Sequence, residues 1–287
     1  MTTATLIDGK RIAQDIQQQT AARVERVKQA TGVTACLATV LVGEDPASAK
    51  YVGAKRRLCE KLGLTSVFVK MDETTTTGQL VDKIAQLGRD EKVHGILLQH
   101  PVPTQIDERA AFEAIPAHKD VDGVTFHSFG TMFYGLPGYE SCTPGGIIRL
   151  LDAYDVTIRG KHAVVVGRSA ILGKPMAGLL MNRDATVTVC HSKTVDLPGI
   201  VKQADIIVAA VGRPAFVKGD WVKEGAVVID AGFNPGPAGN VGDVDFEPAS
   251  ERASLITPVP GGVGPMTLAV LVEQTSIAAA RAAGVKP

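Results

Sequence analysis

The chain has 287 residues, which is enough for about two domains of ordinary size. Its 30 Lys and Arg residues balance 30 Asp and Glu residues, and neither sign forms a long run, so we expect no general nucleic-acid binding. Apolar residues make up 45% of the chain and charged residues 21%, a composition typical of globular rather than disordered proteins.

No stretch of the sequence approaches 18 consecutive apolar residues, so we expect no membrane-spanning helix and no membrane partner. The first ten residues lack a basic segment followed by an apolar one, which does not fit a secretion signal and favours the cytoplasm. The four cysteines, Cys36, Cys59, Cys142 and Cys190, form no Cys-x-x-Cys pair. We therefore expect four free thiols and no metal site.

The first half of the chain alternates helical and strand patterns. Helices are expected over residues 12–29, 47–62 and 77–89, and strands over residues 36–42, 66–71 and 94–99. The strands are continuous apolar runs, which is typical of parallel strands buried on both faces. A polar region rich in Pro and Gly, residues 116–144, interrupts the alternation and indicates a domain boundary near its end.

The second half repeats the alternation, after a helix expected over residues 145–154 with Thr143 as its cap and Pro144 in its first turn. A helix is expected over residues 176–183, and strands over residues 162–166, 186–190, 205–211 and 226–230. We predict two α/β domains: an amino-terminal domain, 1–142, and a Rossmann-like, doubly wound parallel sheet, 143–265. A final apolar helix, 266–287, is long enough to pack back on the first domain.

A Gly-rich turn follows the strand over residues 162–166 and precedes a helix, the position at which a dinucleotide pyrophosphate binds. The sequence of this turn, Gly167-Arg168-Ser169 followed by Gly173, departs from the Gly-x-Gly-x-x-Gly pattern. An ordinary turn is therefore the alternative to a dinucleotide-binding turn. The next strand ends in Cys190-His-Ser192-Lys-Thr194 and carries no acid for a ribose hydroxyl. The lack of an acid here, together with Arg168, favours binding of a ribose 2′-phosphate and hence of NADP. A solvated polar loop with no ligand is the alternative.

Three polar side chains of the first half are candidates for a catalytic site. Tyr51 and Lys55 lie one helical turn apart, so both emerge on one face, where a buried Lys can take part in proton transfer. Gln99 follows a buried strand, at the sheet edge where α/β proteins bind ligands. The alternatives are an exposed surface Lys and a Gln that caps its own loop.

Two loops are further candidates. Asp122 lies between Val121 and Gly123, where an acid either binds a ligand amino group or forms a turn with its own backbone. Residues 256–267 hold three Gly and three Pro, so this backbone is fixed and can approach a ligand closely, although a structural linker is the alternative.

Six segments occur together in one order across nearly the whole chain: Tyr51–Lys55, Gly95–Pro103, Lys119–Gly123, Gly167–Pro175, Gly242–Phe246 and Thr257–Thr267. In these segments the chain resembles the bifunctional methylenetetrahydrofolate dehydrogenase/methenyltetrahydrofolate cyclohydrolase (FolD) family. The resemblance implies two α/β domains with a folate cleft between them, and a homodimer formed through the nucleotide-binding domains. It also implies oxidation of 5,10-methylenetetrahydrofolate by NADP, followed by hydrolysis of 5,10-methenyltetrahydrofolate to 10-formyltetrahydrofolate.

The resemblance also implies roles for residues. Lys55 would be the central catalytic group, Tyr51 and Gln99 would position it and the substrate, and Asp122 would hold the pterin. The residues expected to line the folate site are Pro260, Gly261 and Gly262. Those expected to contact NADP are Gly167, Arg168, Ser169, Ser192 and Phe233.

Two residues depart from the family pattern and leave the ratio of the two activities open. His100 stands where Leu is usual, and Phe233 stands where Ile is usual before Asn234. The alternative functions are an NADP-dependent dehydrogenase of another small substrate and a non-catalytic nucleotide sensor. Both predict loss of the first-half motifs, which are present here.

Overall fold

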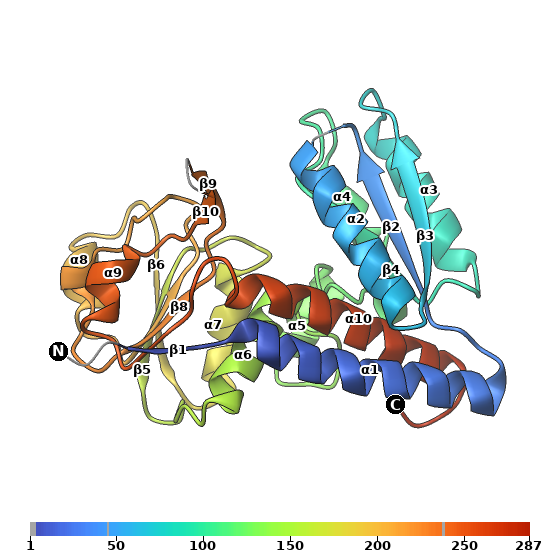
Figure 1. Cartoon of the computed structure of the whole chain (residues 1–287). Coiled ribbons are helices and arrows are strands. Elements are labelled where there is room, and N and C mark those ends of the chain that lie inside the picture. Colours follow the sequence, from blue (N-terminus) through green and yellow to red (C-terminus); the bar gives the residue numbers. More distant parts are fainter. Residues whose placement is uncertain (1–3, 45, 237–238) are drawn as a thin grey trace. The chain divides into compact units, whose positions relative to one another are not determined.

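The computed structural model describes residues 4–44, 46–236 and 239–287, but not the side chains of residues 46–51. The described residues form two compact units (Figure 1). Residues 4–14, 131–137 and 141–267 make up the six-stranded unit, and residues 15–130, 138–140 and 268–287 make up the three-stranded unit. This grouping differs from the predicted bounds of 1–142 and 143–265 at the amino terminus, because β1 (Thr5–Leu6) pairs with β11 (Leu255–Ile256).

The three-stranded unit is built on a parallel sheet of order β3-β2-β4. Its elements are β2 (Cys36–Val42), α2 (Pro46–Lys61), β3 (Thr65–Met71), α3 (Thr77–Arg89), β4 (Gly95–Leu98), α4 (Glu108–Glu113) and the 3₁₀ turn η1 (Ala117–Lys119). Every residue of the central strand β2 is buried, and Leu80 and Ile84 of α3 pack in the same core. This arrangement places the carboxyl ends of β2 and β4 at one edge of the sheet.

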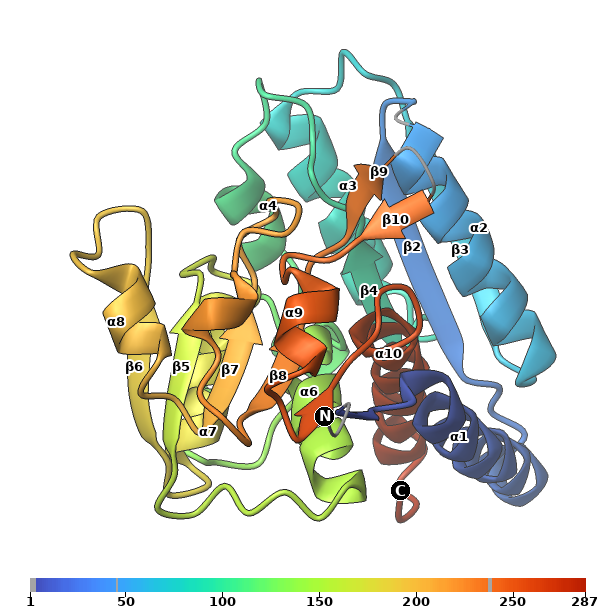
Figure 2. The ribbon, with the colours of Figure 1, turned by 60° about the vertical axis from the view of Figure 1, so that its left-hand side comes forward.

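The six-stranded unit is built on a sheet of order β1-β11-β8-β7-β5-β6, in which all recorded pairs are parallel. Figure 2 shows the neighbouring strands β6, β5, β7 and β8. The remaining strands are β5 (His162–Val166), β6 (Thr186–Cys190), β7 (Ile206–Ala209), β8 (Val227–Asp230) and the antiparallel pair β9 (Asn234–Gly236) and β10 (Gly239–Val241). The helices are α6 (Cys142–Ala153), α7 (Gly173–Met181), α8 (Leu197–Val201), α9 (Phe246–Ser250) and the 3₁₀ turn η2 (Gly219–Trp221).

Chain order reverses at β5 in this sheet, because β6 lies on one side of β5 and β7 on the other. Apolar residues of the strands, among them Val164, Ile207 and Val228, form a core with residues of the surrounding helices. A reversal of this kind opens a crevice at the carboxyl ends of the strands, which is the usual ligand site of doubly wound sheets.

Three helices belong in part to each unit: α1 (Gly9–Thr31), α5 (Phe126–Phe133) and α10 (Val263–Ala282). By length and composition α10 could cross a membrane, but 67% of its apolar window is buried inside the protein. Its amino end packs through Met266 against Gly146, and a Cβ on Gly95 of β4 would lie 3.1 Å from the Thr275 hydroxyl. These contacts are those of a core helix.

Some local predictions were wrong. The cap of α6 is Ser141 rather than Thr143, and the Thr143 hydroxyl instead lies 2.9 Å from the Thr267 hydroxyl. The short strands β1 and β11, the β9–β10 hairpin and the helices α5, α8 and α9 were not predicted. The four cysteines are free and buried.

Candidate active site

Lys55 and Gln99 meet in the three-stranded unit. Lys55 lies on α2, and its ammonium Nζ donates a hydrogen bond of 2.8 Å to Oε1 of Gln99. Gln99 follows β4, and its backbone N–H donates to the Val40 carbonyl at 2.8 Å. Its side-chain Nε2 donates to the backbone carbonyl of His100, which fixes the direction of the carboxamide. The structure therefore brings the predicted Lys and Gln together, and their role in one site stays a prediction.

Tyr51 lies on α2 one turn before Lys55, but its side chain lies outside the described part of the structure. The imidazole of His100 pairs loosely with Glu108, with Nδ1 and Oε1 3.8 Å apart, and meets the Phe112 ring edge-on. The backbone carbonyl of His100, not its imidazole, is what contacts Gln99. Any residue at this position supplies that carbonyl.

Asp122 lies half-buried in the loop that follows η1, and its neighbour Asp120 holds that loop together. The fully buried Asp120 carboxylate accepts from the backbone N–H groups of Val124 and Thr125 and from the Thr125 hydroxyl. Asp120 therefore forms this turn with backbone groups of its own loop. The loop packs closely on β4, because a Cβ on Gly95 would overlap the Val121 side chain.

The turn after β5 is a cradle of backbone groups. Gly167 has φ +137°, and a Cβ there would overlap the Ala210 carbonyl oxygen. A Cβ on Gly173 would in turn overlap the Gly167 carbonyl oxygen, so both glycines are required by close approach. In the described part of the chain, the backbone N–H groups of residues 168–171 meet no acceptor. Such groups at a helix start suit an anion.

Ser169 has a second role in this turn. Its hydroxyl oxygen accepts from the backbone N–H groups of Leu172 and Gly173 at 3.2 and 3.3 Å, and this holds the turn that leads into α7. Its own O–H remains available to donate. The exposed Arg168 side chain has no ion-pair partner among the residues that the structure describes.

Ser192 lies exposed in the turn that ends β6, beside the Gly-rich turn. Val166 pairs with Cys190, and the Gly167 N–H donates to the Cys190 carbonyl, so the two turns begin at adjacent strand ends. Hydrogen bonds between His191 and Thr194 hold the turn and leave Ser192 on its surface. The predicted Arg168 and Ser192 therefore share one edge of the sheet.

Phe233 follows β8 and is 47% exposed. Beside it lie two buried acids that sequence reasoning did not assign, Asp230 at the end of β8 and Asp243 in the Gly242–Phe246 motif. Burial raises the pKa of Asp230 to about 6, even though three backbone N–H groups favour its charged form. Two features of the sequence could have indicated this pair: Asp230 ends an apolar strand, and Asp243 lies in a Gly-Asp-Val motif.

Pro260, Gly261 and Gly262 lie in the loop before α10, in the six-stranded unit. Gly261 has φ +118°, and the Gly262 N–H closes the turn on the Pro258 carbonyl at 2.9 Å. A Cβ on Gly9 would overlap the Gly262 carbonyl oxygen, so the start of α1 packs directly on this backbone. Pro260 is exposed and Gly262 is buried.

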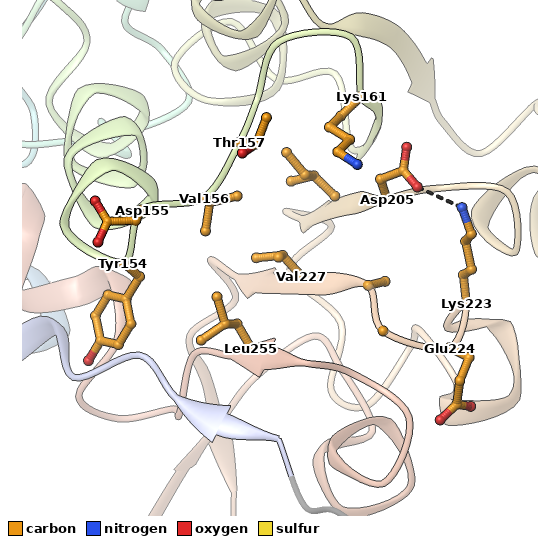
Figure 3. A pocket seen from close by; sticks show the side chains of 13 residues that line it. Tyr154, Asp155, Val156, Thr157, Lys161, Asp205, Lys223, Glu224, Val227 and Leu255 are labelled. Atoms are coloured by element: carbon orange, nitrogen blue, oxygen red, sulfur yellow. Dashed lines mark hydrogen bonds and ion pairs between the residues drawn. The ribbon is translucent and has the colours of Figure 1, made fainter.

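A cavity of about 320 Å³ lies at the opposite edge of the six-stranded sheet (Figure 3). Its lining includes Lys161, Asp205 and Leu255, which mark the amino ends of β5, β7 and β11. An ion pair of 2.6 Å joins Asp205 and Lys223 at its rim. Ligands of doubly wound sheets bind at the carboxyl ends, so we do not place the cofactor here. The described residues hold no cluster of three or more His, Cys, Asp or Glu that would suit a metal ion.

A cradle of backbone N–H groups at the reversal point of a doubly wound sheet and a Lys–amide pair on a second α/β unit are features of dinucleotide-dependent α/β enzymes. The family model for the catalytic domain of tetrahydrofolate dehydrogenase/cyclohydrolase matches residues 7–122. The model for the NAD(P)-binding domain of the same enzymes matches residues 141–283. The chain belongs to this family.

Relatives and solved structures agree with this assignment. Bifunctional protein FolD 1 of Streptomyces avermitilis is 61% identical over 284 residues, which cover 99% of this chain and 98% of the relative. The FolD structure from Campylobacter jejuni matches with a TM-score of 0.95 and 44% identity, covering 97% of this chain and 99% of that chain. The Trypanosoma brucei FolD complexed with NADP and an inhibitor matches with a TM-score of 0.94 and 37% identity, covering 98% and 99%.

The protein is accordingly a bifunctional dehydrogenase and cyclohydrolase of folate one-carbon interconversion, with NADP as its cofactor. The predicted family, the two-domain α/β architecture with a Rossmann-like sheet, and the cofactor are confirmed.

Proposed function

We propose that Lys55 is the proton-transfer residue of the cyclohydrolase reaction and that Gln99 holds it in place. The observation that carries this proposal is the 2.8 Å hydrogen bond from Lys55 Nζ to Gln99 Oε1. The carboxamide is itself held by its neighbour's backbone carbonyl, so it offers the Lys one fixed acceptor. A Lys restrained in this way keeps its amine at one point relative to a bound substrate.

The folate is held by residues of several loops. Asp122 accepts hydrogen bonds from the amino group and ring N–H of the pterin, and Tyr51, one helical turn before Lys55, contributes to substrate binding. Pro260, Gly261 and Gly262 present backbone to the folate, since two glycines and a proline allow close approach without side chains in the way. Asp120 preorganises the loop around Asp122 by accepting hydrogen bonds from the backbone N–H groups of Val124 and Thr125.

NADP fits the turn after β5. The unpaired N–H groups of residues 168–171 suit its pyrophosphate, and the Ser169 O–H can donate to the same group. Arg168 and Ser192 lie at adjacent strand ends, and residues 190–194 include no Asp or Glu, which suits the 2′-phosphate. Phe233, exposed after β8, contacts the remainder of the cofactor. Bound NADP supplies the hydride acceptor for the methylene carbon.

Hydrolysis of 5,10-methenyltetrahydrofolate requires a proton to be removed from water and one to be delivered to N5. Water adds to the methenyl carbon, which is positively charged because it is flanked by N5 and N10, and the attacking water must lose a proton. Lys55 as the free amine accepts this proton and then donates it to N5 as the bond between the carbon and N5 breaks. Loss of the remaining hydroxyl proton gives 10-formyltetrahydrofolate, so the net release is one proton.

We expect Lys55→Met to reduce cyclohydrolase activity by about 100-fold or more, because an apolar side chain of similar length cannot transfer a proton. Binding of folate and NADP should change by less than about threefold. Lys61→Met, on the same helix but exposed at its end, is the matched control and should behave as the parent. Hydrolysis of 5,10-methenyltetrahydrofolate is followed directly by absorbance. A Lys55→Met variant that hydrolyses it at the parent rate would remove Lys55 from the mechanism.

We also propose a homodimer in the cytoplasm, formed through the six-stranded unit. Phe133, Tyr134, Leu136 and Met181 of this unit are 41–81% exposed. The segment that carries the first three is held on α7 by Asn182, which donates to the Met132 carbonyl at 2.7 Å. Several exposed large apolar side chains in one unit are typical of a protein interface.

A further inference from the structure

Asp230 and Asp243 form a buried carboxylate pair in the six-stranded unit, and the catalytic and binding roles above do not use it. Asp230 is 3% exposed and Asp243 is fully buried. Burying an acid costs free energy unless its oxygens are hydrogen-bonded. The groups that bind these two carboxylates must therefore offset the cost of burying them together.

Asp243 collects donors from two separate loops. Its Oδ2 accepts from the N–H groups of Val211 and Gly212, and its Oδ1 from the Arg213 N–H, so it binds three successive residues of the loop after β7. Oδ1 also accepts from Nδ2 of Asn234 at 2.8 Å, which fixes the first residue of β9, next to Phe233 at the end of the loop after β8. One carboxylate therefore ties the ends of two neighbouring strands together.

Asp230 holds Asp243 in turn. Its carboxylate accepts from the N–H groups of Asp243 and Val244, each at 2.9 Å, and from the Gly232 N–H. A Cβ on Gly242 would overlap the Asp230 carboxylate, and a Cβ on Gly232 would overlap that of Asp243. Each glycine backbone packs directly against one of the two carboxylates, and this close packing fixes the position of both acids.

The sheet order decides which part of the cofactor these loops face. A dinucleotide crosses a doubly wound sheet at the reversal point, which here lies at β5. The pyrophosphate turn follows β5 and the 2′-phosphate residues follow β5 and β6, on one side of that point. The loops after β7 and β8 lie on the other side, where the nicotinamide half is expected.

We propose that Asp243, held by Asp230, is a positioning residue for the nicotinamide half of NADP: it acts through the loops 211–213 and 231–234 and does not touch the cofactor. This inference rests on the proposed NADP site. It follows that the dehydrogenase reaction depends on the pair, whereas hydrolysis of added 5,10-methenyltetrahydrofolate, which requires no hydride acceptor, does not. A purely structural pair would affect both activities alike.

The test is Asp243→Asn, which keeps the side chain's size but replaces one acceptor oxygen by an NH₂ group. We expect KM for NADP to rise tenfold or more and dehydrogenase kcat to fall, since displacement of a reacting group by about 1 Å can cost 100-fold. Cyclohydrolase activity, and the Kd of adenosine 2′,5′-bisphosphate, which lacks the nicotinamide half, should stay within twofold. Asp245→Asn, the same change at a half-exposed acid two residues away, is the matched control.

A milder variant covers the case in which Asp243→Asn does not fold. Asn234→Ser removes one donor and leaves the carboxylate with its three backbone partners, so we expect a rise of about threefold in KM for NADP alone. Unchanged NADP kinetics in either folded variant, or equal losses of both activities, would overturn the inference. A parent protein that binds neither NADP nor adenosine 2′,5′-bisphosphate would instead overturn the proposed cofactor site.

Discussion

We propose that cofactor choice depends on Arg168. It lies at the end of β5, beside the turn that carries Ser192, and no described acid pairs with it. A charge-assisted contact of this kind contributes about 1.5–3 kcal/mol, which corresponds to roughly ten- to a hundredfold in kcat/KM. We expect Arg168→Ala to lower the NADP:NAD ratio of kcat/KM by this factor.

This ratio should be measured in phosphate-free buffer, because free phosphate can occupy an empty 2′-phosphate site. Arg159→Ala is the matched control, since the Arg159 side chain is 84% exposed and pairs with Asp184 at the surface. If Arg168→Ala keeps the parent's discrimination, the 2′-phosphate is bound by other groups.

The sequence predicts the positions of single side chains better than it predicts hydrogen-bond networks between residues. Lys55 and Gln99 are accessible to sequence reasoning because helical spacing and a strand end each place one of them. Asp120, Asp230 and Asp243 are not, because their partners are backbone N–H groups, which every residue carries. Only the fold shows which acid meets which loop.

Among the elements, α10 fixes the loop that carries Asp122. Gln274 of this helix is 4% exposed; its Nε2 donates to the carbonyls of Val121 and Glu140, and its Oε1 accepts from the Glu140 N–H. Each buried group left without a partner costs about 1–3 kcal/mol. We expect Gln274→Leu to lower the free energy of unfolding by about 2–4 kcal/mol.

We also expect Gln274→Leu to raise KM for the folate at temperatures where the variant remains folded, as Asp122→Ala should do by removing the carboxylate itself. KM for NADP should stay at the parent value in both. Gln29→Leu on the exposed face of α1 is the control and should change neither stability nor KM. A Gln274→Leu protein with parent stability and parent KM for the folate would show that the loop is held elsewhere.

The long elements were predictable because their apolar patterns are long. The strands at residues 36–42, 162–166 and 186–190 were predicted with the bounds that the structure has. Strands of two or three residues, such as β1, β9 and β11, are too short to show a period, and their pairing depends on segments far away in the chain. The cap of α6 was misplaced because Thr143 and Ser141 are both good cap residues in sequence.

For the whole molecule we expect a dimer whose interface includes Tyr134 and Leu136, which are 81% and 57% exposed. Replacing both by Asp places charge in that interface and should give monomers by sedimentation velocity at concentrations where the parent is dimeric. Val195→Asp is the control, because Val195 is as exposed but lies in the turn after β6. A double variant that sediments like the parent would place the interface elsewhere.

The central claim is that one chain both oxidises and hydrolyses its folate. The most direct measurement mixes the parent protein with 5,10-methylenetetrahydrofolate and NADP and follows NADPH and the methenyl compound together by absorbance. We predict one NADPH formed for each folate consumed, with the methenyl compound converted to 10-formyltetrahydrofolate faster than in buffer alone. Absence of NADPH, or a methenyl compound that decays only at its rate in buffer, would contradict the account.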